Sequence, residues 1–170
     1  MNDQLKNLPR ETLETMLVDF AKNWLAHDGL WFQTVEQECG LETAIRLDTQ
    51  AWQEFTRIEA RRIMERHQIP INGGLEALKK ALGFRLYAFL NEQIITEETE
   101  NSFLFRMVDC RVQSARRRKN LPLFPCKSVG IVEYTEFAGT IDARIKTECI
   151  ACPPDEGERD FYCGWRFTIE

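Results

Sequence analysis

Residues 143–169 of this chain read ARIKTECIACPPDEGERDFYCGWRFTI. Apolar and polar residues alternate over 143–150 and, more clearly than anywhere else in the sequence, over 161–169. Such alternation is typical of strands with one buried face, and Pro153 and Pro154 mark a loop between them. We therefore expect an antiparallel hairpin, in which the end of the first strand lies beside the start of the second.

Three cysteines lie at that end of the hairpin. Cys149 closes the first strand, Cys152 stands in the loop and Cys163 opens the second strand. A fourth, Cys126, directly precedes a candidate helix starting at Ser128, and the positive N-terminus of a helix favours a thiolate. Four converging thiolates predict a closed structural metal site made of four cysteines. Zinc is favoured over an iron–sulfur centre, which the same ligands also suit.

Other interpretations of the cysteines stay open. A CxxC pair is also the motif of thioredoxin-like redox proteins, although there it is expected between a strand and a helix, not between two strands. Free cysteines are also common as small buried apolar residues. Cys110, just after a predicted strand, is a further candidate for one of the four metal ligands.

The sequence before residue 92 has a helical pattern. Apolar residues recur at three-to-four spacing, which predicts about four helices. The first is interrupted at Asp28 and Gly29, a short second helix ends at Gly40, the third spans residues 42–67 and the fourth carries residues 75–89.

The second half has a mixed pattern. It predicts a strand over 103–109, a polar helix over 111–120 and a helix over 128–137, for which a strand is the alternative. The basic run at 116–119 is expected on a solvated helix face. We therefore predict one α+β domain over residues 1–170: a helical layer, 1–92, packed on a small antiparallel sheet with a crossing helix and a C-terminal zinc-binding hairpin, 93–170.

Charge and hydropathy narrow the function classes. The net charge of −5 argues against direct nucleic-acid binding, which needs a basic surface. Charged residues break every long apolar stretch, and the N-terminus is too polar for a secretory signal. We therefore expect no membrane association and a cytoplasmic protein, where thiols stay reduced and available to a metal.

The order of these cysteines resembles that of the four-vinyl reductase domain. That domain also occurs in the sensor modules of phenol- and xylene-responsive transcriptional activators. In those sensors the resemblance implies a zinc held by three cysteines and one glutamate. Cys126, Cys152 and Cys163 match the three cysteines, and Cys149 stands at the glutamate position.

The whole chain also resembles a family of uncharacterised cytosolic proteins common in anaerobes, similar to the hydrolases of L-2-amino-thiazoline-4-carboxylate. The resemblance is carried by WLAHDGLWF (24–32), FRMVDCRVQSARRRKNLPLFPCKSVGIVEYTEF (105–137) and IKTECIACPP (145–154). It implies a helical layer against a sheet with an enclosed ligand pocket.

Two further groups of residues are candidates for binding a small molecule. Trp24, Asp28 and Trp31 flank the predicted helix break and suit an aromatic pocket, although a capping Asp28 with two core tryptophans is the plainer interpretation. Arg106 and Arg111 suit a carboxylate ligand. The ligand is thus expected to be aromatic or a carboxylate.

Catalytic candidates are Cys110, Asp109 and His27. Arginines on either side of Cys110 are expected to lower the pKa of its thiol and favour a nucleophile, whereas a buried thiol beside a surface Asp–Arg pair is the alternative. His27 is one of two histidines able to act as an acid or base near neutral pH.

Together these residues predict a cytosolic, zinc-binding, sensor-like domain for a small molecule. The alternative is a small hydrolase of a cyclic amino or thiazoline-type carboxylic acid that uses Cys110, Asp109 and His27. An adaptor without a ligand is a third hypothesis. Since no DNA-binding motif is present, a sensor role calls for a partner chain or a homodimer.

Overall fold

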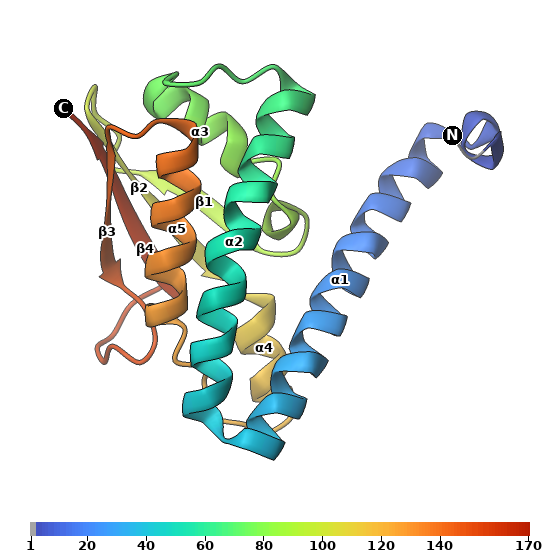
Figure 1. Ribbon diagram of the computed structural model, residues 1–170, viewed down its shortest axis with the longest axis vertical. Coiled ribbons are helices and arrows are strands. Elements are labelled where there is room, and N and C mark those ends of the chain that lie inside the picture. The colour runs from blue at the N-terminus through green and yellow to red at the C-terminus, as the bar shows by residue number, and fades with distance from the viewer. Residues whose placement is uncertain (1–2) are drawn as a thin grey trace.

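The alternating stretches form the strands of one antiparallel sheet. In the computed structural model, which describes residues 3–170, the strand order is β1-β2-β4-β3 (Figure 1). The strands are β1 (Glu92–Thr96), β2 (Ser102–Asp109), β3 (Ile145–Ala151) and β4 (Cys163–Ile169). The predicted hairpin is confirmed, because β3 pairs antiparallel with β4. An irregularity between Cys149 and Ala151 shifts the register just where the first strand ends.

Helices cover one face of this sheet. They are α1 (Arg10–Cys39), α2 (Leu41–His67), α3 (Gly74–Leu82), α4 (Arg111–Arg118) and α5 (Lys127–Ile141), with short 3-10 segments η1 (Asp3–Asn7) and η2 (Leu86–Phe89). Figure 1 shows α5 against the sheet, α2 outside α5, and α1 leaning away so that its N-terminal half projects. The predicted α+β class is therefore confirmed.

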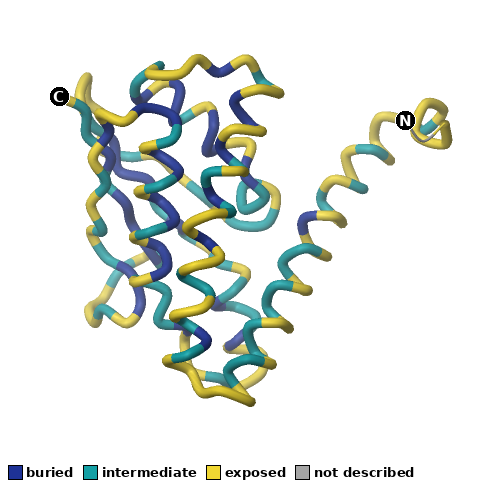
Figure 2. Tube along the Cα trace, in the orientation of Figure 1, coloured by how far each residue is buried: buried dark blue, intermediate teal, exposed yellow. Residues whose placement is uncertain are grey.

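The core lies between α5 and the sheet. Trp165, Phe167 and Phe103 from the strands meet Phe137 and Tyr134 from α5, and all are buried (Figure 2). Burial of large apolar side chains is the main favourable term in folding, so this layer sets the position of α5 on the sheet.

The predicted break at Asp28 and Gly29 is wrong, because α1 runs unbroken from Arg10 to Cys39. Contacts on both sides of the glycine hold the helix. Trp24 stacks on Phe55 of α2 at a ring separation of 5.3 Å, and Phe32 packs on Phe124 at 4.8 Å. A helical glycine costs only about 1 kcal/mol, which tertiary packing of this kind outweighs.

The other helix boundaries are close to their prediction. The helix at 42–67 and the two later helices are confirmed, whereas the fourth ends early, at Leu82, and the chain then turns into η2. Strand β1 was not predicted. It is a short edge strand, and edge strands with exposed residues on both faces have no apolar alternation to mark them.

A buried arginine ties the helices together. Arg85, 2% exposed, pairs with Glu59 of α2 at 2.9 Å and with Glu133 of α5 at 2.7 Å. Its guanidinium also lies 4.6 Å from the ring centre of Phe137. A buried charge is tolerated only when it is paired, so these contacts fix the segment after α3 against α2 and α5.

The projecting half of α1 carries exposed apolar side chains, among them Leu17 and Phe20. Within residues 3–170 no helix is long and apolar enough to cross a membrane. The homodimer expected from the sequence stays a prediction.

The continuity of α1 can be tested at its glycine. Gly29→Ala should raise the free energy of unfolding by about 0.5–1 kcal/mol, because alanine is the better helix former. A Cβ at this position meets only the Gln33 amide nitrogen, at 4.0 Å. Urea denaturation followed by circular dichroism measures the effect. Gly139→Ala in the last turn of α5, where a Cβ meets nothing within 4 Å, is the control for a second helical glycine and should also stabilise.

Substitution of Gly40 should change the free energy of unfolding in the opposite direction. Its φ of +83° between α1 and α2 disfavours any residue with a Cβ, so Gly40→Ala should destabilise the protein. If Gly29→Ala behaved like Gly40→Ala, the chain would be interrupted at residue 29 as the sequence pattern suggests.

Candidate functional site

A cavity of about 420 Å³ opens between the helices and the sheet. Its walls come from α1, α2, α4 and α5, and its floor from the ends of β2 and β4. Its lining includes the aromatic side chains of Phe32, Trp52, Tyr87, Phe124, Tyr134 and Trp165. A concave, mainly apolar space of this size suits a small organic molecule.

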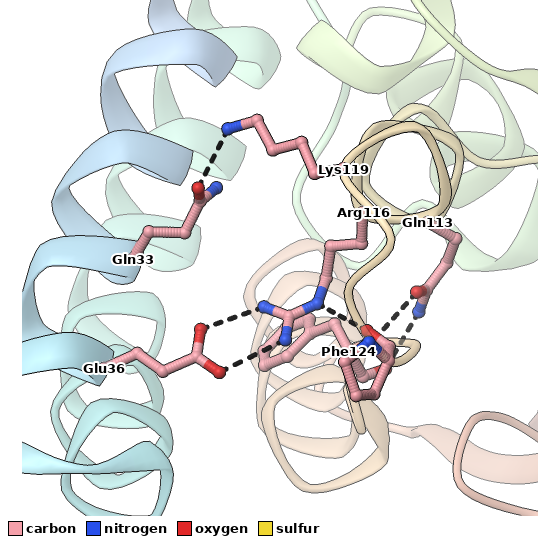
Figure 3. Close-up of polar contacts among 7 residues, drawn as sticks. Gln33, Glu36, Gln113, Arg116, Lys119 and Phe124 are labelled. Atoms are coloured by element: carbon pink, nitrogen blue, oxygen red, sulfur yellow. Dashed lines mark hydrogen bonds and ion pairs between the residues drawn. The ribbon is translucent and has the colours of Figure 1, made fainter.

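Polar contacts fasten one wall of the cavity. Arg116 of α4 forms a two-pronged pair with Glu36 of α1, at 3.0 and 3.2 Å, and donates to the Pro122 carbonyl at 2.7 Å (Figure 3). Lys119 reaches Gln33 on α1 at 2.8 Å. The basic run is therefore not wholly solvated as predicted, because Arg116 is buried in an interhelical pair.

Gln113 joins this wall to the cysteines. Its side chain is 1% exposed and exchanges two hydrogen bonds, both 2.9 Å, with the backbone of Phe124 (Figure 3). Its amide also donates to the sulfur of Cys126 at 3.5 Å. The connector after α4 is thus held in a fixed conformation, with Cys126 at the N-terminus of α5 as the sequence predicts.

Three cysteine side chains surround that of Cys152. The sulfurs of Cys126 and Cys152 lie 3.4 Å apart, and the thiols of Cys149 and Cys163 also interact with that of Cys152. Cys152 is 1% exposed. The Lys127 backbone N–H donates to the Pro153 carbonyl at 3.0 Å, which holds the CxxC loop against the start of α5.

Within this cluster, the pKa of Cys152 is shifted in the opposite direction to those of Cys126 and Cys149. Hydrogen bonding to Cys126, Cys149 and Cys163 raises the pKa of Cys152 well above its usual value. Hydrogen bonding to Cys152 lowers the pKa of Cys126 and of Cys149. A cluster of thiols that shares protons in this way can exchange them for one soft cation.

The thiols face each other more closely than ligands of one zinc ion would. Zn–S distances of about 2.3 Å place the sulfurs of a tetrahedral site about 3.8 Å apart. Cys126 and Cys152 are nearer than this, and as the side chains stand no three His, Cys, Asp or Glu residues within 3–170 are arranged to hold a metal ion. The donor set of four cysteines fits zinc chemically.

Carboxylates also line the cavity. Asp28 of α1, Asp48 of α2 and Glu133 of α5 all lie on its wall. Burial, with the charges of Asp28 and Glu133, raises the pKa of Asp48 to about 7, against a hydrogen bond from Trp52 that lowers it. Burial raises the pKa of Glu133 too, by more than its Arg85 partner lowers it. Nothing in the sequence marks Asp48 or Glu133, because each looks like an ordinary polar residue of a helix.

The structure brings together only part of the predicted ligand-binding set. Asp28 and Arg111 line the cavity. Trp24 packs against Trp52 and Phe55 beside the cavity, and Trp31 is 66% exposed on α1. Arg106 lies elsewhere on the sheet, where it pairs with Glu97 at 3.1 Å and covers the ring of Phe161.

The predicted catalytic residues are not assembled. Cys110 lines the cavity, whereas Asp109 and His27 are exposed, and Asp109 accepts a hydrogen bond from Ser114. Burial raises the pKa of Cys110 to about 12, although backbone N–H groups partly oppose this. The expected lowering of this pKa by the neighbouring arginines is therefore wrong, because burial of the thiol dominates.

The sequence matches one known protein family over almost all of its length. A model described as a family of unknown function (DUF6125) matches residues 6–169. The chain belongs to the DUF6125 family. No curated protein matches it. The DUF6125 family has no assigned activity, so the resemblances to thiazoline-carboxylate hydrolases and four-vinyl reductase domains stay predictions.

Cys110 offers a test of the cavity's chemistry. At about pH 8 its alkylation by iodoacetamide should be at least about a thousandfold slower than that of exposed Cys39, since raising a thiol pKa by one cuts the thiolate fraction tenfold. Peptide mass spectrometry reports each rate. In urea the two should react alike. Equal rates in the folded protein would instead show that Cys110 is accessible and that its pKa is not raised.

Proposed function

We propose that this member of the DUF6125 family is a small-molecule-binding, sensor-like domain. The observation that carries the proposal is the aromatic-lined cavity of about 420 Å³, which has polar groups at a few points of its wall. Apolar walls supply affinity, and sparse buried polar groups supply orientation and selectivity. The third hypothesis, an adaptor without a ligand, predicts a solid interior. The presence of this cavity does not fit that hypothesis.

We propose further that Cys126, Cys149, Cys152 and Cys163 hold a structural zinc ion. Support comes from the convergence of all four thiols from a hairpin, its loop and a helix start. Four protein thiolates would leave the metal no open position, so the ion would join α5 to the β3–β4 end of the sheet. The ion would act as a crosslink between these elements and not as a reaction centre.

The hydrolase alternative rests on one observation. Cys110 lines the cavity, so a bound molecule would lie near its sulfur. Its raised pKa and the exposed positions of Asp109 and His27 leave it without an activating base. Ligand binding is therefore the function that the geometry supports better.

Metal content tests the structural site. Protein purified anaerobically should contain one zinc ion per chain, and Cys152→Ser should lose it, because Cys152 is the thiol that contacts the other three. Inductively coupled plasma mass spectrometry measures the ratio. Cys39→Ser, at an exposed cysteine on α1, is the control and should keep the ion. A wild-type protein without metal would refute the site.

Cavity binding can be tested with a neutral apolar fluorophore, N-phenyl-1-naphthylamine. Its emission should rise on binding to the wild type. Gly29→Phe should weaken binding at least about tenfold, because Gly29 lines the cavity and has free space beside it. Gly139→Phe adds the same ring at an exposed position near the C-terminal end of α5, outside the cavity lining, and should have no effect. Equal binding by both variants would place the probe outside the cavity.

A further inference from the structure

Asp28 and Asp48 place two carboxylates on the cavity wall. Among residues 3–170, neither Asp28 nor Asp48 forms an ion pair with a lysine or arginine, and the charge of Asp28 raises the pKa of Asp48. The exposed ring of His27 offsets Asp28 only in part. Both half-buried carboxylates lie on the wall of one cavity, so a cation between them would relieve both desolvation and repulsion.

A buried donor in the same wall also lacks a partner. The indole N–H of Trp165, a residue 1% exposed, makes no hydrogen bond within the described chain, although Trp165 lines the cavity. Buried polar groups are nearly always hydrogen-bonded, so this donor calls for an acceptor atom, such as an oxygen, on a molecule bound in the cavity. This observation is independent of the carboxylates.

The aromatic lining suits a cation. Trp52 stacks on Tyr87 with 6.0 Å between ring centres, and Tyr134 stacks on Trp165 at 4.7 Å. All four line the cavity. The faces of such rings attract a positively charged group, most strongly where water is excluded.

We propose that the cavity binds a protonated amine with its ammonium group between Asp28 and Asp48, on an aromatic or apolar frame that also carries an acceptor for the Trp165 N–H. This inference rests on the proposed ligand-binding function and names the ligand class. It replaces the carboxylate ligand expected from the sequence. Of the two arginines behind that expectation, Arg106 is paired with Glu97 and Arg111 is exposed at the cavity rim.

The cations around the cavity do not reverse this preference. Arg116 is already paired with Glu36, and Arg85 pairs with Glu133 and Glu59. The remaining ones are exposed residues at the rim: Lys22, Arg111, Arg118 and Lys119. Exposed charges are screened by water and salt, whereas the half-buried carboxylates act through a less polar medium.

Three probes with one aromatic frame test the inference: 2-phenylethylammonium, neutral 2-phenylethanol and anionic 3-phenylpropanoate. Isothermal titration calorimetry with the full-length protein should show the ammonium binding about ten- to a hundredfold tighter than the alcohol, and the carboxylate weakest. Asp48→Asn, which keeps the side-chain shape, should remove about tenfold or more of the ammonium affinity and leave the alcohol unchanged. Asp160→Asn in an exposed loop is the matched control.

The outcomes separate the two proposals. Alcohol and ammonium binding equally, or ammonium binding that survives both Asp48→Asn and Asp28→Asn, would overturn the amine inference and leave the ligand-binding function standing. The wild-type ranking of the probes tests the inference even if a variant fails to fold. Binding of none of the three probes, together with no fluorophore binding, would overturn both proposals.

Discussion

The buried pairing of Arg85 with Glu59 and Glu133 is the constraint on which the helical layer depends. A guanidinium cannot lose its proton, so burial leaves only pairing as a means of accommodating its charge. Removing one partner of a buried pair typically costs about 3–5 kcal/mol, several times the value of a surface pair. The segment after α3 is therefore fixed relative to both α2 and α5.

The same constraint shapes the cavity. Glu133, Tyr87 and Tyr134 contact Arg85 on one side and line the cavity on the other. Asp28 and Asp48 face the cavity from α1 and α2 without an equivalent cation. Glu133 is thus paired with a buried guanidinium, whereas within the described residues Asp28 and Asp48 form no ion pair with a lysine or an arginine.

The periodicity of apolar residues predicted the helices and strands whose burial repeats regularly along the chain. The alternation around Trp165 and Phe167 identified the hairpin, because period-two burial specifies a strand with one buried face. The sequence pattern could not show that α1 continues through Gly29. The continuity of α1 depends on contacts of Trp24 and Phe32 with aromatic residues that are distant in sequence. The burial of Arg116 was missed for a similar reason, because its partner Glu36 lies on another helix and only the folded chain brings them together.

The cysteine cluster and the cavity share a wall, which no spacing rule could indicate. Cys126, Cys152 and Cys163 belong to the cluster and also line the cavity, whereas Cys149 belongs to the cluster alone. A zinc ion held by all four would fix the wall beside Gln113 and Trp165. Metal and ligand would then contact the same wall, so each would favour the ordered wall that the other requires, and their binding would be mutually reinforcing.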